Sequence, residues 1–132
     1  MSNIIIASNP IVTTEYHTDK NLLYQTIHQP ARLHSELFRE SLNEGLKALK
    51  KYRVCKWLTA DNSRDNRTSE ILEWIENEWA QQAIQAGCKY RANVVRRNNS
   101  APGTVSSIPG LQMREFTHQV DALNWLDSLP DN

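Results

Sequence analysis

The chain of 132 residues has little of several features that mark common protein classes. Its 15 Lys and Arg residues balance 15 Asp and Glu residues, whereas a nucleic-acid binder needs an excess of cations. Its longest aliphatic run, Ile4–Ile6, is far shorter than the roughly 20 apolar residues that cross a bilayer. The N-terminus also lacks the basic flank and apolar stretch of a secretory signal. We therefore expect a cytoplasmic protein without a membrane span or a nucleic-acid partner.

Residue types that bind metals or perform covalent catalysis are equally sparse. The cysteines, Cys55 and Cys88, do not form a zinc-binding pair, and in their predicted positions thiols usually pack as small apolar groups. The four histidines are scattered, the four glycines never cluster into a phosphate-binding loop, and no Gly-x-Ser-x-Gly elbow is present. We predict no catalytic residue, no metal site and no cofactor.

What the chain does have is enough apolar residues, 39%, for one hydrophobic core. We expect a single domain over residues 1–132. Three runs rich in β-branched and aromatic residues, at 4–6, 11–16 and 22–27, read as strands. The turn residues Asp19–Asn21 join the second and third runs as an antiparallel hairpin.

Helices and strands alternate after Pro30. The apolar spacing predicts helices over 33–49, 71–83 and 121–129, and Gly87 is expected to end the second of them. Strands are predicted over 53–59, 90–95 and 111–116, with a loop over 96–109. The charges of the first helix are either a docking face or a solvated surface. The pattern predicts an α/β fold: a single-layer mixed sheet of four to six strands, with about three helices packed mainly on one face and the 53–59 strand in the interior.

The loop after the central strand is the candidate site. It begins Asp61-Asn62-Ser63-Arg64 and leads into a predicted helix. Ligands of α/β domains bind at the carboxyl ends of sheet strands, and helix starts favour anions. A phosphate on Ser63 would add about two negative charges there. The alternative is a polar connection whose side chains cap backbone groups.

Four tryptophans, Trp57, Trp74, Trp79 and Trp125, either line a pocket for an apolar ligand or pack the helices onto the sheet. Trp125 lies off the apolar stripe of the last helix, which makes it a candidate partner contact.

Charge is segregated along the chain. The second predicted helix is acidic, whereas Arg91, Arg96 and Arg97 form a basic group on the following strand and loop. A two-fold contact could pair these patches around Trp125. The sequence thus predicts a homodimer whose contact includes Trp125, Arg96 and Arg97 and weakens with salt.

Three passages carry a family resemblance: Tyr52–Asp61, Glu73–Trp79 and Ala86–Tyr90, together with the ending Asp121–Leu126. In pattern and order they resemble small bacterial proteins of the STAS-like superfamily, the relatives of the anti-sigma-factor antagonist SpoIIAA, over about residues 11–129. The resemblance implies a mixed sheet with helices on one side and a non-catalytic signalling role through protein contact, with nucleotides or lipids bound in some relatives.

In the antagonists of that superfamily, a Ser or Thr at the start of the helix after a central strand is phosphorylated by a partner kinase. The matching stretch here begins at Asp61 and lacks the glycine of the family pattern, and its loop is longer. The resemblance therefore carries over only Asp61 and Ser63 as candidate site residues.

These observations lead to one expected function and two alternatives. We expect a regulatory or binding module that acts through protein–protein contact, with a small ligand or a phosphate at the 61–64 loop. One alternative is a sensor or carrier of an apolar ligand held by the tryptophans. The other is a small enzyme with a pocket between Trp57, Asp61 and His118.

Overall fold

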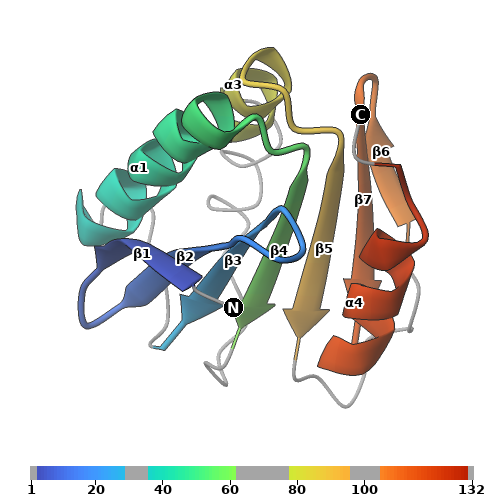
Figure 1. Ribbon diagram of the computed structural model, residues 1–132, viewed down its shortest axis with the longest axis horizontal. Coiled ribbons are helices and arrows are strands. Elements are labelled where there is room, and N and C mark those ends of the chain that lie inside the picture. The colour runs from blue at the N-terminus through green and yellow to red at the C-terminus, as the bar shows by residue number, and fades with distance from the viewer. Residues whose placement is uncertain (1–2, 29–35, 62–77, 96–104, 131–132) are drawn as a thin grey trace.

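A computed structural model describes residues 3–28, 36–61, 78–95 and 105–130. These residues form an α/β fold built on one mixed sheet of seven strands, in the order β1-β2-β3-β4-β5-β7-β6 (Figure 1). The α/β class, the mixed sheet and the interior position of the central strand, β4, are as predicted. The sheet is wider than the predicted four to six strands.

The N-terminal part of the sheet is antiparallel. β1 (Asn3–Ser8), β2 (Val12–His17) and β3 (Leu22–Ile27) pair in sequence order. The hairpin between β2 and β3 is confirmed, and its last turn residue, Asn21, has a φ of 50°. Asparagine tolerates this left-handed conformation better than most residues, which explains its place in the turn.

The middle of the sheet is parallel. β4 (Lys56–Asp61) lies between β3 and β5 (Tyr90–Val95), and β7 (Leu111–Phe116) follows β5. The seventh strand, β6 (Val105–Ile108), pairs antiparallel with β7. It lies in the stretch predicted to be a loop, so that prediction is wrong for its last residues. Gly110, with a φ of 94°, makes the tight turn between the two strands.

Helices cover both faces of the sheet. α1 (Glu36–Tyr52) and α3 (Ala80–Gln85) pack on the first face, whereas α4 (Gln119–Asp127) packs on the second. The expectation that the helices pack mainly on one face holds for α1 and α3, whereas α4 lies on the opposite face. Gly87, with a φ of 107°, follows the end of α3, as predicted. Most of the predicted 71–83 helix lies outside the described residues.

Two hydrophobic cores result from this arrangement, because the interior strands are apolar on both sides. Trp57 lies in the first core, under α1 and α3, and its neighbour Leu58 lies in the second, under α4. Ala122 and Leu126 of α4 are buried in that second core. Successive side chains of a strand point to opposite faces, so β4 serves both cores.

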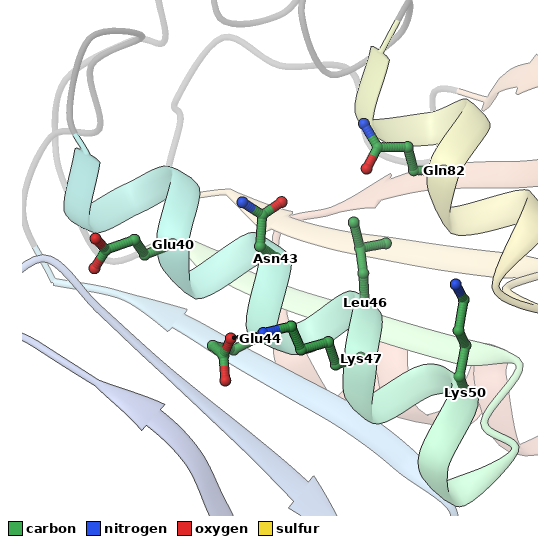
Figure 2. Close-up of a pocket in the computed structure, with 7 residues that line it drawn as sticks. All are labelled: Glu40, Asn43, Glu44, Leu46, Lys47, Lys50 and Gln82. Atoms are coloured by element: carbon green, nitrogen blue, oxygen red, sulfur yellow. Dashed lines mark hydrogen bonds and ion pairs between the residues drawn. The ribbon is translucent and has the colours of Figure 1, made fainter.

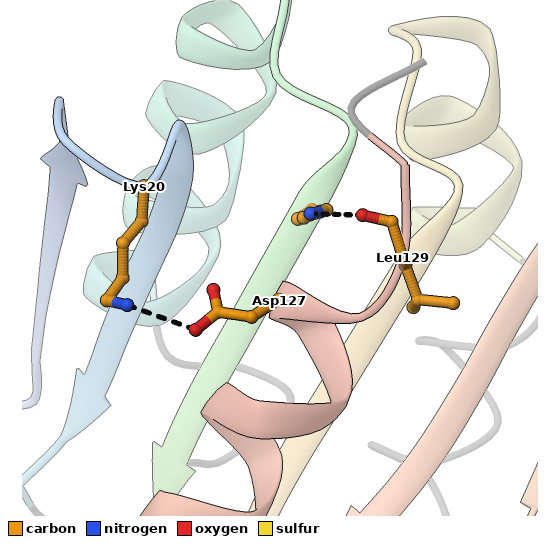
Figure 3. Close-up of polar contacts among 4 residues, drawn as sticks. Lys20, Asp127 and Leu129 are labelled. Atoms are coloured by element: carbon orange, nitrogen blue, oxygen red, sulfur yellow. Dashed lines mark hydrogen bonds and ion pairs between the residues drawn. The ribbon is translucent and has the colours of Figure 1, made fainter.

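Polar contacts attach the end of α4 to the amino ends of the strands (Figure 3). The buried Lys56 ammonium donates a hydrogen bond of 2.8 Å to the Leu129 carbonyl, and Lys20 forms an ion pair of 3.2 Å with Asp127. The Cys55 thiol lies 3.7 Å from the Pro130 carbonyl. The Lys56 and Cys55 contacts hold the segment that follows α4 against the start of β4, and the Lys20–Asp127 pair joins the end of α4 to the turn between β2 and β3.

Candidate functional site

The predicted site begins at the centre of the carboxyl edge of the parallel strands. Asp61 ends β4, and its backbone is in register with Ile27 of β3 and Val95 of β5. Asn62, Ser63 and Arg64 lie outside the described residues. The structure therefore places the start of the candidate loop where α/β domains usually bind their ligands.

A row of polar side chains crosses the first face of the sheet at the level of Thr59, which precedes Asp61 on β4. Gln25 and Thr59 are neighbours in register on β3 and β4 and are fully buried. The Thr59 hydroxyl donates to the Gln25 amide oxygen over 3.4 Å, and the Gln25 amide nitrogen donates to Thr14 over 3.4 Å. Thr14 shares a hydrogen bond of 2.8 Å with Ser41 of α1. This row links three strands and a helix.

Thr59 is the centre of the row because its hydroxyl also accepts two hydrogen bonds. The Trp57 indole nitrogen donates over 3.1 Å and the Arg91 guanidinium over 3.4 Å. The same guanidinium lies over the Trp79 ring, 4.6 Å from its centroid, in a cation–π contact that desolvation strengthens. Only 2% of Arg91 is exposed, which corrects its placement in a basic surface patch. Arg91 instead joins β5 to β4 and α3.

Two buried polar atoms beside this row have no hydrogen-bond partner among the described residues. They are the Trp79 indole nitrogen and the Asn93 amide oxygen. Asn93 is in register with Thr59 on the neighbouring strand. The hydrogen-bonding groups on the β5 side of the row are therefore less completely paired than those on the β3 side. Each unpartnered buried polar group costs about 1–3 kcal/mol.

The row can hold neighbouring strands in place, but its side chains are poorly suited to covalent catalysis. Its hydroxyl and amide groups do not titrate near neutral pH, and an arginine stays protonated. Cys88, nearby in the first core, is a poor nucleophile because burial raises the pKa of its thiol to about 12. The row can hold the ends of β3, β4 and β5 rigidly beneath the loop.

We expect Thr59→Val to lower the free energy of unfolding by about 1–2 kcal/mol. Valine keeps the shape but leaves the Trp57 indole N–H buried without an acceptor. Thr26→Val is the matched control, because Thr26 lies on β3 with its side chain on the other face, and it should change stability by less than about 0.5 kcal/mol. Chemical denaturation of both variants measures the difference. Equal effects would contradict a central role for Thr59.

The tryptophans that the structure describes pack the two cores separately. Trp57 and Trp79 meet edge to face at 5.0 Å in the first core. Trp125 lies 5.8 Å from Phe116 and 6.4 Å from Tyr90, against the second core. For these three, the packing interpretation is confirmed. Trp74 lies outside the described residues.

Of the residues predicted to contact a partner, only Trp125 lies within the described residues, where it is half-buried against the second core. Arg96 and Arg97 lie outside the described residues. The structure also separates two of the residues predicted to line the pocket of the alternative enzyme. Trp57 is in the first core, whereas His118 is the N-cap of α4 on the other side of the sheet.

A separate groove of about 410 Å³ lies between α1 and α3 (Figure 2). Leu46 contributes an apolar side chain, and the Lys47 ammonium lies 2.9 Å from a Glu44 carboxylate oxygen at the surface. The residues that line the groove are Glu40, Asn43, Glu44, Leu46, Lys47, Lys50 and Gln82. The charged side chains of α1 are thus exposed and border a groove, an arrangement that fits both a solvated surface and a docking face.

The sequence reading missed Gln25, Thr59 and Arg91 as a cluster. One signal was available: Gln25 sits between the inward-facing Leu23 and Ile27, so the period of the strand places a polar side chain in the core. Within the described ranges, no three His, Cys, Asp or Glu side chains are placed to bind a metal. No helix among those residues is long and apolar enough to cross a membrane.

Comparison of the chain with protein-family models, with curated proteins and with solved structures gave no match in any of the three searches.

Proposed function

We propose that this protein is a non-catalytic regulatory module that contacts another protein through the loop after β4. The observation that carries the proposal is the buried polar row directly beneath Asp61. It joins Thr14, Gln25 and Thr59 by hydrogen bonds across adjacent strands and so gives the loop a rigid base. Binding residues of α/β proteins are typically carried by loops on such a scaffold.

The resemblance to the STAS-like superfamily supports the same proposal and adds a switch. A phosphate on Ser63 would place about two negative charges between Asp61 and Arg64. Repulsion from the Asp61 carboxylate and attraction to the Arg64 guanidinium would change the surface that the loop offers. The partner would therefore distinguish the two forms of the loop.

A charge reversal in the loop tests the proposal. We expect Arg64→Glu to weaken binding of the partner at least tenfold, because the change removes a cation and adds an anion at the contact. Lys47→Glu makes the same change of charge on α1, where the ammonium is exposed, and should leave binding unchanged. Affinity capture at native expression identifies the partner, phosphosite mapping examines Ser63, and calorimetry with the purified partner compares the variants.

Equal binding by the wild type, Arg64→Glu and Lys47→Glu would show that the loop does not form the contact. Loss of binding in both variants would show a general dependence on charge and would also contradict the proposal. Circular dichroism of each variant confirms that the fold is retained.

A further inference from the structure

β1 forms one edge of the sheet and pairs only with β2 among the described strands. Its sequence, Asn-Ile-Ile-Ile-Ala-Ser, contains no charged residue and no proline. Natural edge strands usually carry a Lys, a Pro, an inward charge or a β-bulge, because their open N–H and C=O groups otherwise pair with another strand. β1 has a register shift between Ile5 and Ala7 but none of these side chains, so the open side of its regular part, Asn3–Ile5, is suited to strand pairing.

Exposed apolar side chains gather along the same edge. The described residues include four exposed large apolar side chains: Ile4, Ile5, Leu37 and Val120. Ile4 and Ile5 belong to β1, and the carbonyl of Leu37 accepts a hydrogen bond from Asn9, just after β1. Ile5 is 63% exposed and shares a sheet face with α4, whose main contacts with the sheet are with β4, β5 and β7. The described part of α4 therefore leaves Ile5 uncovered.

We propose that β1 is the interface of a homodimer, in which it pairs antiparallel with β1 of a second copy. A two-fold axis makes one strand edge complementary to itself, because each N–H of one copy meets a C=O of the other. No charge on β1 opposes its own copy, and the whole chain has no net charge. The pairing joins the two sheets and covers the exposed isoleucines.

The irregularity of β1 indicates the register. The pairing with β2 shifts between Ile5 and Ala7, which leaves Asn3–Ile5 as the regular part of the strand. A two-fold axis at Ile4 pairs this regular part with itself. Ile4 then lies opposite the partner's Ile4, and Asn3 lies opposite the partner's Ile5. This interface differs from the salt-sensitive contact around Trp125 that the sequence predicts.

Sedimentation of the full chain with two matched variants tests the interface. We expect the wild type to dimerise. Ile5→Lys should raise the dimer dissociation constant at least tenfold, because it places one lysine from each copy in an interface that otherwise carries no charge. Val120→Lys is the control, since Val120 is 62% exposed but lies on α4, and it should dimerise like the wild type. Both positions are exposed, so both variants should fold.

A disulfide bond tests the register independently. Directly opposed residues of antiparallel strands bring their Cβ atoms within about 4.5–5.5 Å, close to disulfide range, so oxidised Ile4→Cys should yield a covalent dimer. Cys55 and Cys88 are buried and should not compete. In hydrogen exchange, the amides of β1 should be protected more strongly as protein concentration rises.

Three results would overturn the proposal. The first is a wild type that stays monomeric at high concentration, and the second is an Ile5→Lys dimer as tight as that of the wild type. The third is protection from hydrogen exchange that rises with protein concentration outside β1 but not in β1. A dimer that dissociates in high salt and in Trp125→Glu, but is unaffected by Ile5→Lys, would place the contact around Trp125.

Discussion

Trp57→Ala should lower the free energy of unfolding by about 3–5 kcal/mol, the usual loss when a fully buried tryptophan becomes alanine. The Trp57 side chain is fully buried between β4 and the helices of the first face. Its ring meets Trp79 at 5.0 Å, and its indole N–H bonds to Thr59. The substitution therefore removes apolar packing, an aromatic contact and a hydrogen bond together.

Chemical denaturation with tryptophan-independent detection, such as far-ultraviolet circular dichroism, measures this loss. Trp57→Phe keeps most of the apolar volume and should lose clearly less stability than Trp57→Ala. If both substitutions cost less than about 1 kcal/mol, Trp57 is not a central part of the core.

Gly45→Ala should destabilise the protein by about 1–2 kcal/mol net, although alanine is favoured over glycine by about 1 kcal/mol inside a helix. The reversal follows from the position of Gly45, where α1 crosses Trp57. A Cβ atom at Gly45 would overlap the indole Cη2 atom and lie 3.0 Å from Cζ3. Overpacking of a closed core typically costs about 1–3 kcal/mol, occasionally more, and the large buried ring has little room to move.

Asn43→Ala, at an exposed position of the same helix, is the control for Gly45→Ala. It should leave stability unchanged or raise it slightly, because alanine has the higher helix propensity. A double-mutant cycle with Trp57→Leu adds a second measurement, since the smaller side chain should relieve the overlap and reduce the cost of Gly45→Ala. A stabilising Gly45→Ala would show that α1 does not approach Trp57 this closely.

Elements with a strong local signal could be predicted from the sequence. Six of the seven strands were expected, because alternating or β-branched runs bounded by turn residues mark each of them. The hairpin at Asp19–Asn21 and the end of α3 at Gly87 were expected for the same reason. Only β6 was missed, since Val105–Ile108 follows a stretch rich in Gly, Pro, Ser and Asn and forms a strand by pairing with β7.

The candidate site could be predicted only in part. The position of Asp61 beside the carboxyl end of a central strand follows from the order of elements, although the strand was predicted to end at residue 59 and the structure extends it to Asp61. The polar row did not follow from it, because Thr59 bonds to Gln25 and Arg91, which lie far from it along the chain. An arginine that lies near other arginines in the sequence, as Arg91 does, is typical of a surface patch. Only the burial of Arg91 on β5 shows that it belongs to the core.

The sequence by itself determined the class of the fold, the single mixed sheet and most of its strands, because these depend on the local period of apolar residues and on turn chemistry. The tertiary structure alone decided which face each helix covers, which polar side chains meet in the core and which apolar ones stay exposed at β1. Those outcomes depend on the register between strands distant in sequence, since register sets which side chains become neighbours on a shared face.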